Sequence, residues 1–432
     1  MVGVPHPTTK ARSALVRMAL GPLTVLVLVS TPLGVRVAPA HPADEPHSTL
    51  EAFYRSWTDL VGRRESLEPA AFDSAFAVLV DSLFALDSLG PAILERRWKD
   101  LNPVDRMRFR RALARAIQHR VMGFTEATGK VPKLSLGDVE ASGNAATLQY
   151  AVGEGRGRAS LAVSMFRKTD GTWRVRDVNV DGQSMEEYYR HVVRRPLRSY
   201  SFAYMIARLG DYPYIILEDF ESSPTDTLPP GWGWKGSDND KRKPYRVREE
   251  NGNKYLEATD RGESVILGKD IKWNLREYPY VSFRWRVHEI PKGGDERFDE
   301  TVDSAAGIYF VYRRLLGKIP QSVKYVWSST LPVGSAMLRD GVGKPWMVVA
   351  DSGTDHLGEW RTYVFNLADA YEKTFGRRPP SKPIGIGVLS DANSTHSHAY
   401  ADYDDIRALR EAPPGVTGGV ERILPTNEHA RR

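Results

Sequence analysis

The sequence predicts two folded parts: an α+β domain in which helices pack on a curved antiparallel sheet, then an all-β jelly-roll or β-sandwich domain. Three observations support this prediction. Apolar residues recur at helical spacing through the first third of the chain. From about Lys133 the apolar period becomes two. After residue 212, short alternating segments recur between Gly, Pro, Asn and Asp residues, which is typical of a sandwich.

The amino terminus predicts a secretory signal peptide over residues 1–40. Three basic residues precede an apolar run over residues 18–35, and Ala38-Pro39-Ala40 supplies the small residues that a signal peptidase requires. The alternative is an uncleaved membrane anchor, but prolines and glycines interrupt the run and its core is too short to span a bilayer well. We therefore expect an exported, periplasmic protein.

The composition excludes several classes of function. The formal net charge is +6, but residues 1–40 hold four basic and no acidic residues, which leaves 56 basic and 54 acidic residues in the rest. This near balance gives no support to a nucleic-acid partner. The chain has no cysteine, which excludes disulfides, thiol catalysis, Cys-ligated zinc and lipid attachment through an N-terminal Cys.

The first third of the chain predicts three amphipathic helices. Apolar residues follow helical spacing over Thr49–Arg63 and Pro69–Ser88. A third helix begins at Pro103, behind Asn102 as its N-cap, and runs to about Phe124. Arginines fill much of its other face, either as an ordinary solvated surface or as a surface that docks an acidic partner or an anionic headgroup.

A curved antiparallel sheet is predicted from Lys133 to Val180. Two alternating segments lead to a hairpin turn at Asp170-Gly171 and then to a strand that begins at Trp173. In that strand the apolar residues change parity, and a bulge near Arg176-Asp177 returns them to one face and bends the sheet. We expect such a sheet to wrap against the helices and to enclose an apolar space.

Two helices close this domain. Ser184 stands as N-cap with Glu187 three residues later, which is a capping box. A further amphipathic helix follows Pro196 and extends to Leu209. The stretch Gly153–Gly157 superficially resembles a phosphate-binding loop, but no helix follows it, so we interpret it as a turn.

These elements together resemble the MlaC family, also called toluene-tolerance proteins, over residues 48–212. The resemblance is most specific in Trp173–Ser184 and Tyr188–Arg190. The other residues that carry it are Ile93–Lys99, Asn102-Pro103 with the arginine-rich helix, and Ile206–Leu209. The chain departs from the family in two ways. It lacks a Gly before Trp98, and its long second half has no counterpart in the shuttle family.

The resemblance implies a periplasmic phospholipid-binding protein that holds acyl chains between helices and sheet. It would be a soluble component of an ABC-type envelope lipid transport system, with inner- and outer-membrane components as partners. Neither the residues nor the resemblance point to a catalytic constellation or a cofactor in this domain, so we do not expect an enzyme. The candidate cavity residues, each of which would equally line an ordinary core, are Phe76, Val80, Ile117, Val121, Phe124, Leu148, Tyr150, Leu161, Val163, Met165, Trp173, Val175 and Val178.

Residues 213–410 predict the β-sandwich, interrupted by one helix over Leu367–Phe375, and residues 411–432 predict a flexible tail. The expected strands are Ser264–Leu267, Tyr280–Val287, Gly307–Tyr312, Ser322–Trp327, Trp346–Ala350, Trp360–Asn366, Pro383–Ser390 and Ala399–Ile406. This half resembles an exported bacterial β-sandwich family of unknown function, through Ala305–Val311, Lys324–Trp327, Glu359–Arg361, Phe375-Gly376 with Pro379-Pro380, and Ile384–Ser394. The resemblance implies a fold and no established activity.

One polar stretch of the second half is a candidate metal site. It offers Asp391, His396, His398 and Asp404, where oxygen ligands would suit Ca²⁺ and the histidine pair another divalent metal. The spacing is not that of an EF-hand. The simpler interpretations are a polar turn that feeds the last strand, or a ligand-binding loop.

The second half also carries residues that suit a glycan. Asp299, Glu300 and Asp303 provide carboxylates for acid–base chemistry, and the tryptophans could stack on sugars, although we expect most of them in the core. Serine-hydrolase, zinc-protease and P-loop motifs are absent from the sequence. Two hypotheses follow: a lipid-binding transport protein, or alternatively an envelope glycan-binding or glycan-cleaving β-sandwich protein. One chain could also combine both roles.

Overall fold

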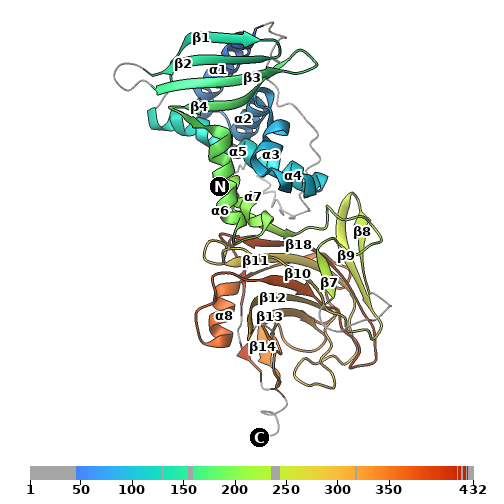
Figure 1. Ribbon diagram of the computed structural model, residues 1–432. Helices are drawn as coiled ribbons and strands as arrows, with labels where there is room; N and C mark the ends of the chain where they lie inside the picture. The colour runs from blue at the N-terminus through green and yellow to red at the C-terminus, as the bar shows by residue number, and fades with distance from the viewer. Residues whose placement is uncertain are drawn as a thin grey trace, which may run out of the picture.

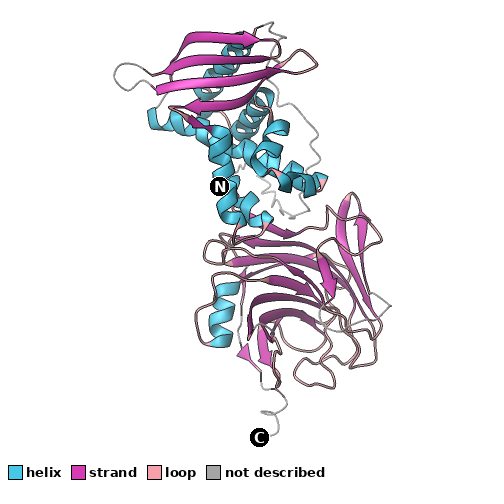
Figure 2. Ribbon diagram, in the orientation of Figure 1, coloured by secondary structure: helices cyan, strands magenta, loops and turns pink. Residues whose placement is uncertain are grey.

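The computed structural model confirms the predicted fold class, an α+β domain followed by a β-sandwich (Figures 1 and 2). It describes residues 45–128, 131–153, 159–234, 244–316, 319–415, 417–419, 422–424 and 426. The expected signal peptide and residues 154–158 of the expected turn lie outside this set. None of the helices within it is long and apolar enough to cross a membrane.

Five helices open the N-terminal domain, which comprises α1–α7 and β1–β5. They are α1 (Pro46–Gly62), α2 (Pro69–Leu83), α3 (Leu86–Leu94), α4 (Arg96–Asp100) and α5 (Pro103–Thr128), with a 3₁₀ turn over Arg64–Ser66. The side chain of Asn102 accepts a hydrogen bond from the Asp105 amide at 2.9 Å, so the predicted N-cap of α5 is confirmed.

The expected helix Pro69–Ser88 is interrupted, and this prediction is wrong in its last residues. α2 ends at Leu83 because Phe84 takes an extended conformation and forms a parallel bridge with Val175. The amide of Ala85 donates to the Val175 carbonyl at 2.9 Å. A helical period continues through Phe84 in the sequence, but pairing with the sheet overrides it.

The sheet of this domain has five antiparallel strands in chain order. They are β1 (Leu134–Ser142), β2 (Ala145–Val152), β3 (Ala159–Arg167), β4 (Trp173–Val180) and β5 (Gln183–Ser184). Ser164 faces Asp177 and Met165 faces Val175, so Arg176 is the extra residue of a bulge. The predicted bulge and the direction in which it returns apolar residues to one face are confirmed.

Two helices complete the domain, α6 (Met185–Leu197) and α7 (Phe202–Leu209). Ser184 Oγ accepts from the Glu187 amide at 3.2 Å, which confirms the predicted N-cap of α6. The short helix α7 contributes to two hydrophobic cores. Met205 and Leu209 lie in the core of the N-terminal domain, whereas Tyr204 and Ala207 lie in the core of the sandwich.

The sandwich consists of two mixed sheets and α8 (Leu367–Phe375), the predicted helix. One sheet has the order β20-β14-β15-β13-β12-β17-β10-β7, and the other β19-β16-β11-β18-β9-β8, with β6 also paired to β18. The strand bounds are β6 (Tyr214–Glu218), β7 (Trp232–Trp234), β8 (Tyr245–Glu250), β9 (Asn253–Asp260), β10 (Leu267–Asp270), β11 (Tyr280–Glu289), β12 (Ala306–Leu315), β13 (Ile319–Ser328), β14 (Ser335–Leu338), β15 (Trp346–Ser352), β16 (Arg361–Asn366), β17 (Gly385–Val388), β18 (Ala399–Leu409), β19 (Thr417–Gly418) and β20 (Arg422–Ile423).

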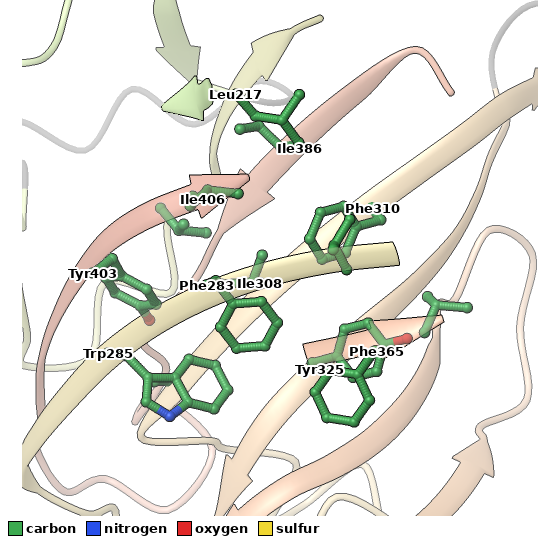
Figure 3. Close-up of a cluster of buried hydrophobic side chains, with 14 of the residues drawn as sticks. Leu217, Phe283, Trp285, Ile308, Phe310, Tyr325, Phe365, Ile386, Tyr403 and Ile406 are labelled. Atoms are coloured by element: carbon green, nitrogen blue, oxygen red, sulfur yellow. The ribbon is translucent and has the colours of Figure 1, made fainter. Parts of the chain in front are cut away.

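Aromatic side chains fill the space between the two sheets. Figure 3 shows Phe283, Phe310, Tyr325 and Phe365 gathered in this core. The rings of Tyr325 and Phe365 stack with centroids 4.0 Å apart. Burying a side chain of this size contributes about 1.5–3 kcal/mol, so these rings are a main source of stability for the domain.

The prediction of a flexible tail over residues 411–432 is wrong for part of that segment. β19 pairs with β16, and β20 pairs with β14. The Leu424 amide also donates to the Ala336 carbonyl at 2.8 Å. Backbone pairing at the edges of both sheets therefore holds these residues on the sandwich.

Because α7 is buried in both cores, we expect the two domains to unfold in one transition. Tyr204→Ala leaves a cavity in the sandwich core and should lower the free energy of unfolding by about 3–5 kcal/mol. Calorimetry should show a single peak that moves to lower temperature as a whole. A peak that splits, with the N-terminal domain melting at its original temperature, would contradict the coupling.

Candidate functional site

An apolar pocket lies in the N-terminal domain between the helices and one face of the sheet. Its volume is about 170 Å³. The lining comes from α1, from the end of α2 with the residue after it, from α5, and from strands β1 to β4 with the residues that precede β1. The lining residues are Leu50, Phe53, Tyr54, Trp57, Leu83, Phe84, Val121, Pro132, Leu134, Tyr150, Val152, Ala159, Leu161, Val163, Val175, Val178 and Val180.

The bulge in β4 gives the pocket its apolar wall. Successive side chains of a strand point to opposite faces, so Val175 and Val178 would lie on opposite faces of a regular strand. The extra residue Arg176 restores the parity, and both valines line the pocket. On the neighbouring strand β3, Leu161 and Val163 are two residues apart and share the same face.

The hydroxyl groups of two lining tyrosines form hydrogen bonds with His47 and Pro132, and these four residues are called the rim of the pocket. Tyr54 Oη donates to the Pro132 carbonyl at 3.0 Å, and Tyr150 Oη lies 3.0 Å from His47 Nδ1. Burial, with the negative charge of Glu51, raises the pKa of Tyr150 to about 12, so this phenol stays neutral at ordinary pH. These two contacts join α1 to the sheet side of the pocket.

A second, smaller recess of about 90 Å³ adjoins the pocket. The two share Phe84, Val121, Val178 and Val180. The recess extends toward α6 and includes Arg120, whose guanidinium carbon lies 4.3 Å from the centroid of the Tyr188 ring. The apolar space therefore leads toward one cationic side chain.

The structure separates the candidate cavity residues into three groups. Six line the pocket: Val121, Tyr150, Leu161, Val163, Val175 and Val178. Six lie in the hydrophobic core outside it, of which Ile117 lines the smaller recess: Phe76, Val80, Ile117, Leu148, Met165 and Trp173. The side chain of Phe124 lies outside the described part of the structure.

The sequence prediction missed the wall that α1 provides. Leu50, Phe53 and Trp57 line the pocket from that helix. Their helical spacing was the available signal, because it predicted an apolar face for the segment. It could not tell whether that face meets the sheet directly or across a space.

A larger cleft of about 720 Å³ lies between α5, α7, β6 and β10. Two of the basic residues on its walls are paired with carboxylates. Arg108 bonds to Asp219, and Lys269 Nζ lies 2.8 Å from Glu218 Oε2. Burial would raise the pKa of Glu218, but Lys269 and Trp232 hold it below its usual value. Arg108 joins the two domains and Lys269 is paired within the sandwich, so these charges have structural roles, and the apolar pocket is the better candidate site despite its smaller volume.

The arginines of α5 make contacts within the protein. Arg110 lies 2.9 Å from Asp87, and Arg106 and Arg115 stack over Trp98 and Tyr212, each 5.5 Å from the ring centroid. Together with Arg108 and Arg120, these arginines join α5 to neighbouring elements. For these five arginines, neither a purely solvated face nor a free docking surface is the correct interpretation.

The four candidate metal ligands do not form one centre. Asp404 bonds to Arg284 and accepts from Asn253 Nδ2 at 2.9 Å. His398 lies 3.9 Å from Glu289, His396 is exposed, and Asp391 is buried. In the described ranges no three His, Asp or Glu side chains are grouped so that they could hold a metal. Asp404 and His398 therefore interact with other residues, and the structure does not bring the four candidates together as ligands.

The carboxylates proposed for acid–base chemistry also have separate partners. Asp299 pairs with Arg339, Glu300 is exposed, and Asp303 is buried and accepts from the Thr395 hydroxyl at 2.6 Å. Among the tryptophans of this half, Trp273, Trp285 and Trp327 are fully buried, as expected for a core. These positions do not support a pair of catalytic carboxylates.

Two family models match the chain, one in each half. Residues 59–211 match the model described as MlaC protein, and residues 231–407 match a model described as a protein of unknown function, DUF3047. Both resemblances expected from the sequence are confirmed. A search of the curated proteins found no match.

Solved structures also align with parts of the chain. One is the phospholipid-binding protein from Ralstonia solanacearum in complex with a phospholipid, with 13% identity, a TM-score of 0.30, and coverage of 35% of this chain and 84% of that one. Another is a carbohydrate-binding module described by its specific mannan recognition, with 16% identity, a TM-score of 0.22, and coverage of 46% of this chain and 99% of that one.

Since the described residues include no group of three candidate metal ligands, we expect the melting temperature to be independent of divalent metals. A ligand at a hundred times its dissociation constant would stabilise the folded state by about 2.7 kcal/mol. Thermal denaturation with 1 mM Ca²⁺, with 1 mM Zn²⁺ and with EDTA should give melting temperatures within about 1 °C of one another. A metal-dependent rise that disappears in the double variant His396→Ala, His398→Ala would restore the metal site.

Proposed function

We propose that the N-terminal domain binds the acyl chain of a phospholipid in the apolar pocket, and that the protein carries lipid in the periplasm as a soluble component of an envelope transport system. The observation that carries the proposal is a pocket with an apolar lining in the region that matches the MlaC model. The proposed activity is binding and release, without a covalent step.

The energetics of the pocket suit an acyl chain. Each methylene removed from water contributes about 0.8 kcal/mol, with no directional requirement. A cavity of about 150 Å³ accommodates a benzene molecule, so a pocket of about 170 Å³ holds roughly six carbon atoms. Their burial contributes about 5 kcal/mol, which favours binding without making release slow. A complete chain requires the pocket to widen or to continue into the adjoining recess.

The rim of the pocket offers a way to widen it. His47 and Tyr54 join the start of α1 to the sheet side through two hydrogen bonds. Each such bond is worth about 0.5–1.5 kcal/mol, so separating them costs little compared with the gain from burying a chain. We propose that α1 moves away from the sheet when lipid enters.

The adjoining recess offers a place for the polar end of the ligand. Arg120 is the cationic residue of its lining, and Tyr188 lies beneath the guanidinium. A phosphate is a strong acceptor for a guanidinium group. We propose that an acyl chain in the pocket places its headgroup near Arg120. The proposal that transport components exchange lipid with this protein rests on the family resemblance alone.

Lipid uptake tests the proposal. Purified protein should yield phospholipid on solvent extraction and mass spectrometry, or should take it up from phosphatidylglycerol vesicles. Val178→Trp fills the space shared by pocket and recess and should reduce bound lipid at least about tenfold. The matched control is Val139→Trp, because Val139 is exposed on β1 and does not line the pocket.

The outcomes of this experiment are distinct. Circular dichroism first establishes that both variants fold. Wild-type protein with no extractable lipid and no uptake would refute the proposal. Equal lipid content in the Val178→Trp and Val139→Trp variants would show that lipid binds elsewhere.

Loosening the rim should accelerate uptake. Tyr54→Phe removes the hydrogen bond to the Pro132 carbonyl while keeping the ring in the lining. Loss of about 0.5–1.5 kcal/mol should raise the uptake rate by a factor of about two to ten. Stopped-flow transfer of a fluorescent fatty acid measures this rate. A rate equal to or below that of the wild type would exclude this hydrogen bond as a restraint on opening.

A further inference from the structure

The sandwich contains a buried lysine that forms no ion pair with the residues the structure describes. Lys324 in β13 is 2% exposed. Among the residues that the structure describes, no carboxylate oxygen lies within 4.0 Å of its Nζ, and the ammonium donates no hydrogen bond. Burial lowers the pKa of Lys324, and the charge of Asp391 offsets this only in part.

Three segments that carry the resemblance of this half converge on Lys324. Tyr309 of β12 lies directly opposite Lys324 in the sheet, and the Nζ is 5.4 Å from the centroid of its ring. On the other side of β12, Tyr309 faces Gly387 of β17, and Asp391 follows that strand. The segments 305–311 and 384–394, which lie far apart in the sequence, therefore meet beside Lys324 in this sheet.

The absence of a side chain at Gly307 leaves room for the side chain of Lys324. A Cβ atom at Gly307 would lie 2.4 Å from Lys324 Cε and 3.3 Å from its Nζ. Gly307 and Tyr309 are two residues apart on β12 and share a face. A glycine within a strand often marks a close approach of another group, and here it makes room for the lysine side chain.

Asp391 is the second buried charged group, and its carboxylate is only partly stabilised by the Ser264 side chain, the Asn393 backbone and the charge of Lys324. It is 6% exposed, and its Oδ1 is buried without a hydrogen-bond partner among the described residues. Three other charged side chains of this region form hydrogen bonds or an ion pair with other residues. Glu296 accepts from Ser304 and Ser328 at 2.9 and 2.6 Å, Asp303 accepts from Thr395, and Arg339 pairs with Asp299.

A second buried charge cluster in the same domain shows the contrast. Arg284, 8% exposed, bonds to Asp404 and donates to Asn253 at 3.1 Å, and Arg286 pairs with Asp402 at 2.8 Å. Pairing of this kind explains why those charges are tolerated. Lys324 and Asp391 attract each other electrostatically but form no ion pair within 4.0 Å in the described part of the chain, and buried charges without a close partner are concentrated at functional sites.

We propose that Lys324, Asp391 and Tyr309 form a binding site for a saccharide. A sugar hydroxyl accepts a hydrogen bond from the ammonium, and its neighbour donates one to the carboxylate. The half-buried ring of Tyr309 offers an apolar surface for the C–H face of the sugar. An anion would gain from Lys324 but would be opposed by Asp391, and a cation the reverse, so a neutral polyhydroxylated ligand satisfies both.

A stability comparison tests whether Lys324 is kept for binding. Lys324→Met should leave the melting temperature unchanged or raise it, because it removes an unpaired buried charge. The matched variant Arg284→Met should lower it by several degrees, because Asp404 then loses its partner. A comparable fall in Lys324→Met would mean that the lysine is part of the structure, and would overturn the proposal.

Direct binding completes the test. Tetrasaccharides of glucose, mannose, galactose and N-acetylglucosamine are offered to the full chain, and binding is followed by saturation-transfer NMR. At least one should bind, and Lys324→Met and Asp391→Asn should each weaken it about tenfold or more. His398→Ala, in the nearby exposed loop, should not. Absence of binding by all four sugars, or binding of acetate in place of a sugar, would refute the site.

Discussion

The arrangement of the molecule depends on the burial of both sides of α7. Tyr204 and Ala207 lie on one side of this helix, while Met205 and Leu209 lie on the other. A helix with two apolar sides is stable only when both are covered, so α7 needs both domains at once. Polar contacts reinforce the junction: Ser201 Oγ donates to the Lys272 carbonyl at 2.8 Å, and Tyr204 Oη to Glu277 at 3.1 Å. Two domains joined in this way are expected to move as one body.

Much of the N-terminal domain could be predicted from residue types. The change of parity in β4 required a bulge, and Asn102 and Ser184 are residues that cap helices because their side chains accept backbone amides. The break at Phe84 could not be predicted, because its cause is pairing with a strand about ninety residues away. The same limit applies to the pocket. Val80 and Val178 are both apolar residues of predicted faces, yet one is packed in the core and the other borders a space.

In the sandwich, long alternating strands were predictable and charged ones were not. β8 carries charged residues on one side and Tyr245, Val247 and Glu249 on the other, so only two apolar residues alternate, which is too short a pattern to recognise. The candidate metal ligands show a related limit. Closeness in sequence suggested a common site for His398 and Asp404, but the ligands' partners come from β9 and β11, which no local spacing reveals. The strands of the expected tail have two residues each and leave no periodic signal.

The polar groups at the two proposed sites differ: those of the pocket are hydrogen-bonded within the protein, whereas some of those in the sandwich are not. The two sites are therefore suited to different classes of ligand. In the pocket, the hydroxyls of Tyr54 and Tyr150 are engaged at the rim, so the remaining lining makes no demand on the orientation of its occupant. Such a site selects by apolar area, as an acyl chain requires. At the site proposed in the sandwich, the Lys324 ammonium and Asp391 Oδ1 have no hydrogen-bond partner among the described residues, so an occupant would supply hydrogen bonds in fixed directions. Such a site selects by the position of hydroxyl groups. A single chain with both kinds of site can hold a lipid through one domain and recognise a hydroxylated surface through the other, and the shared helix α7 would keep the two at a fixed separation.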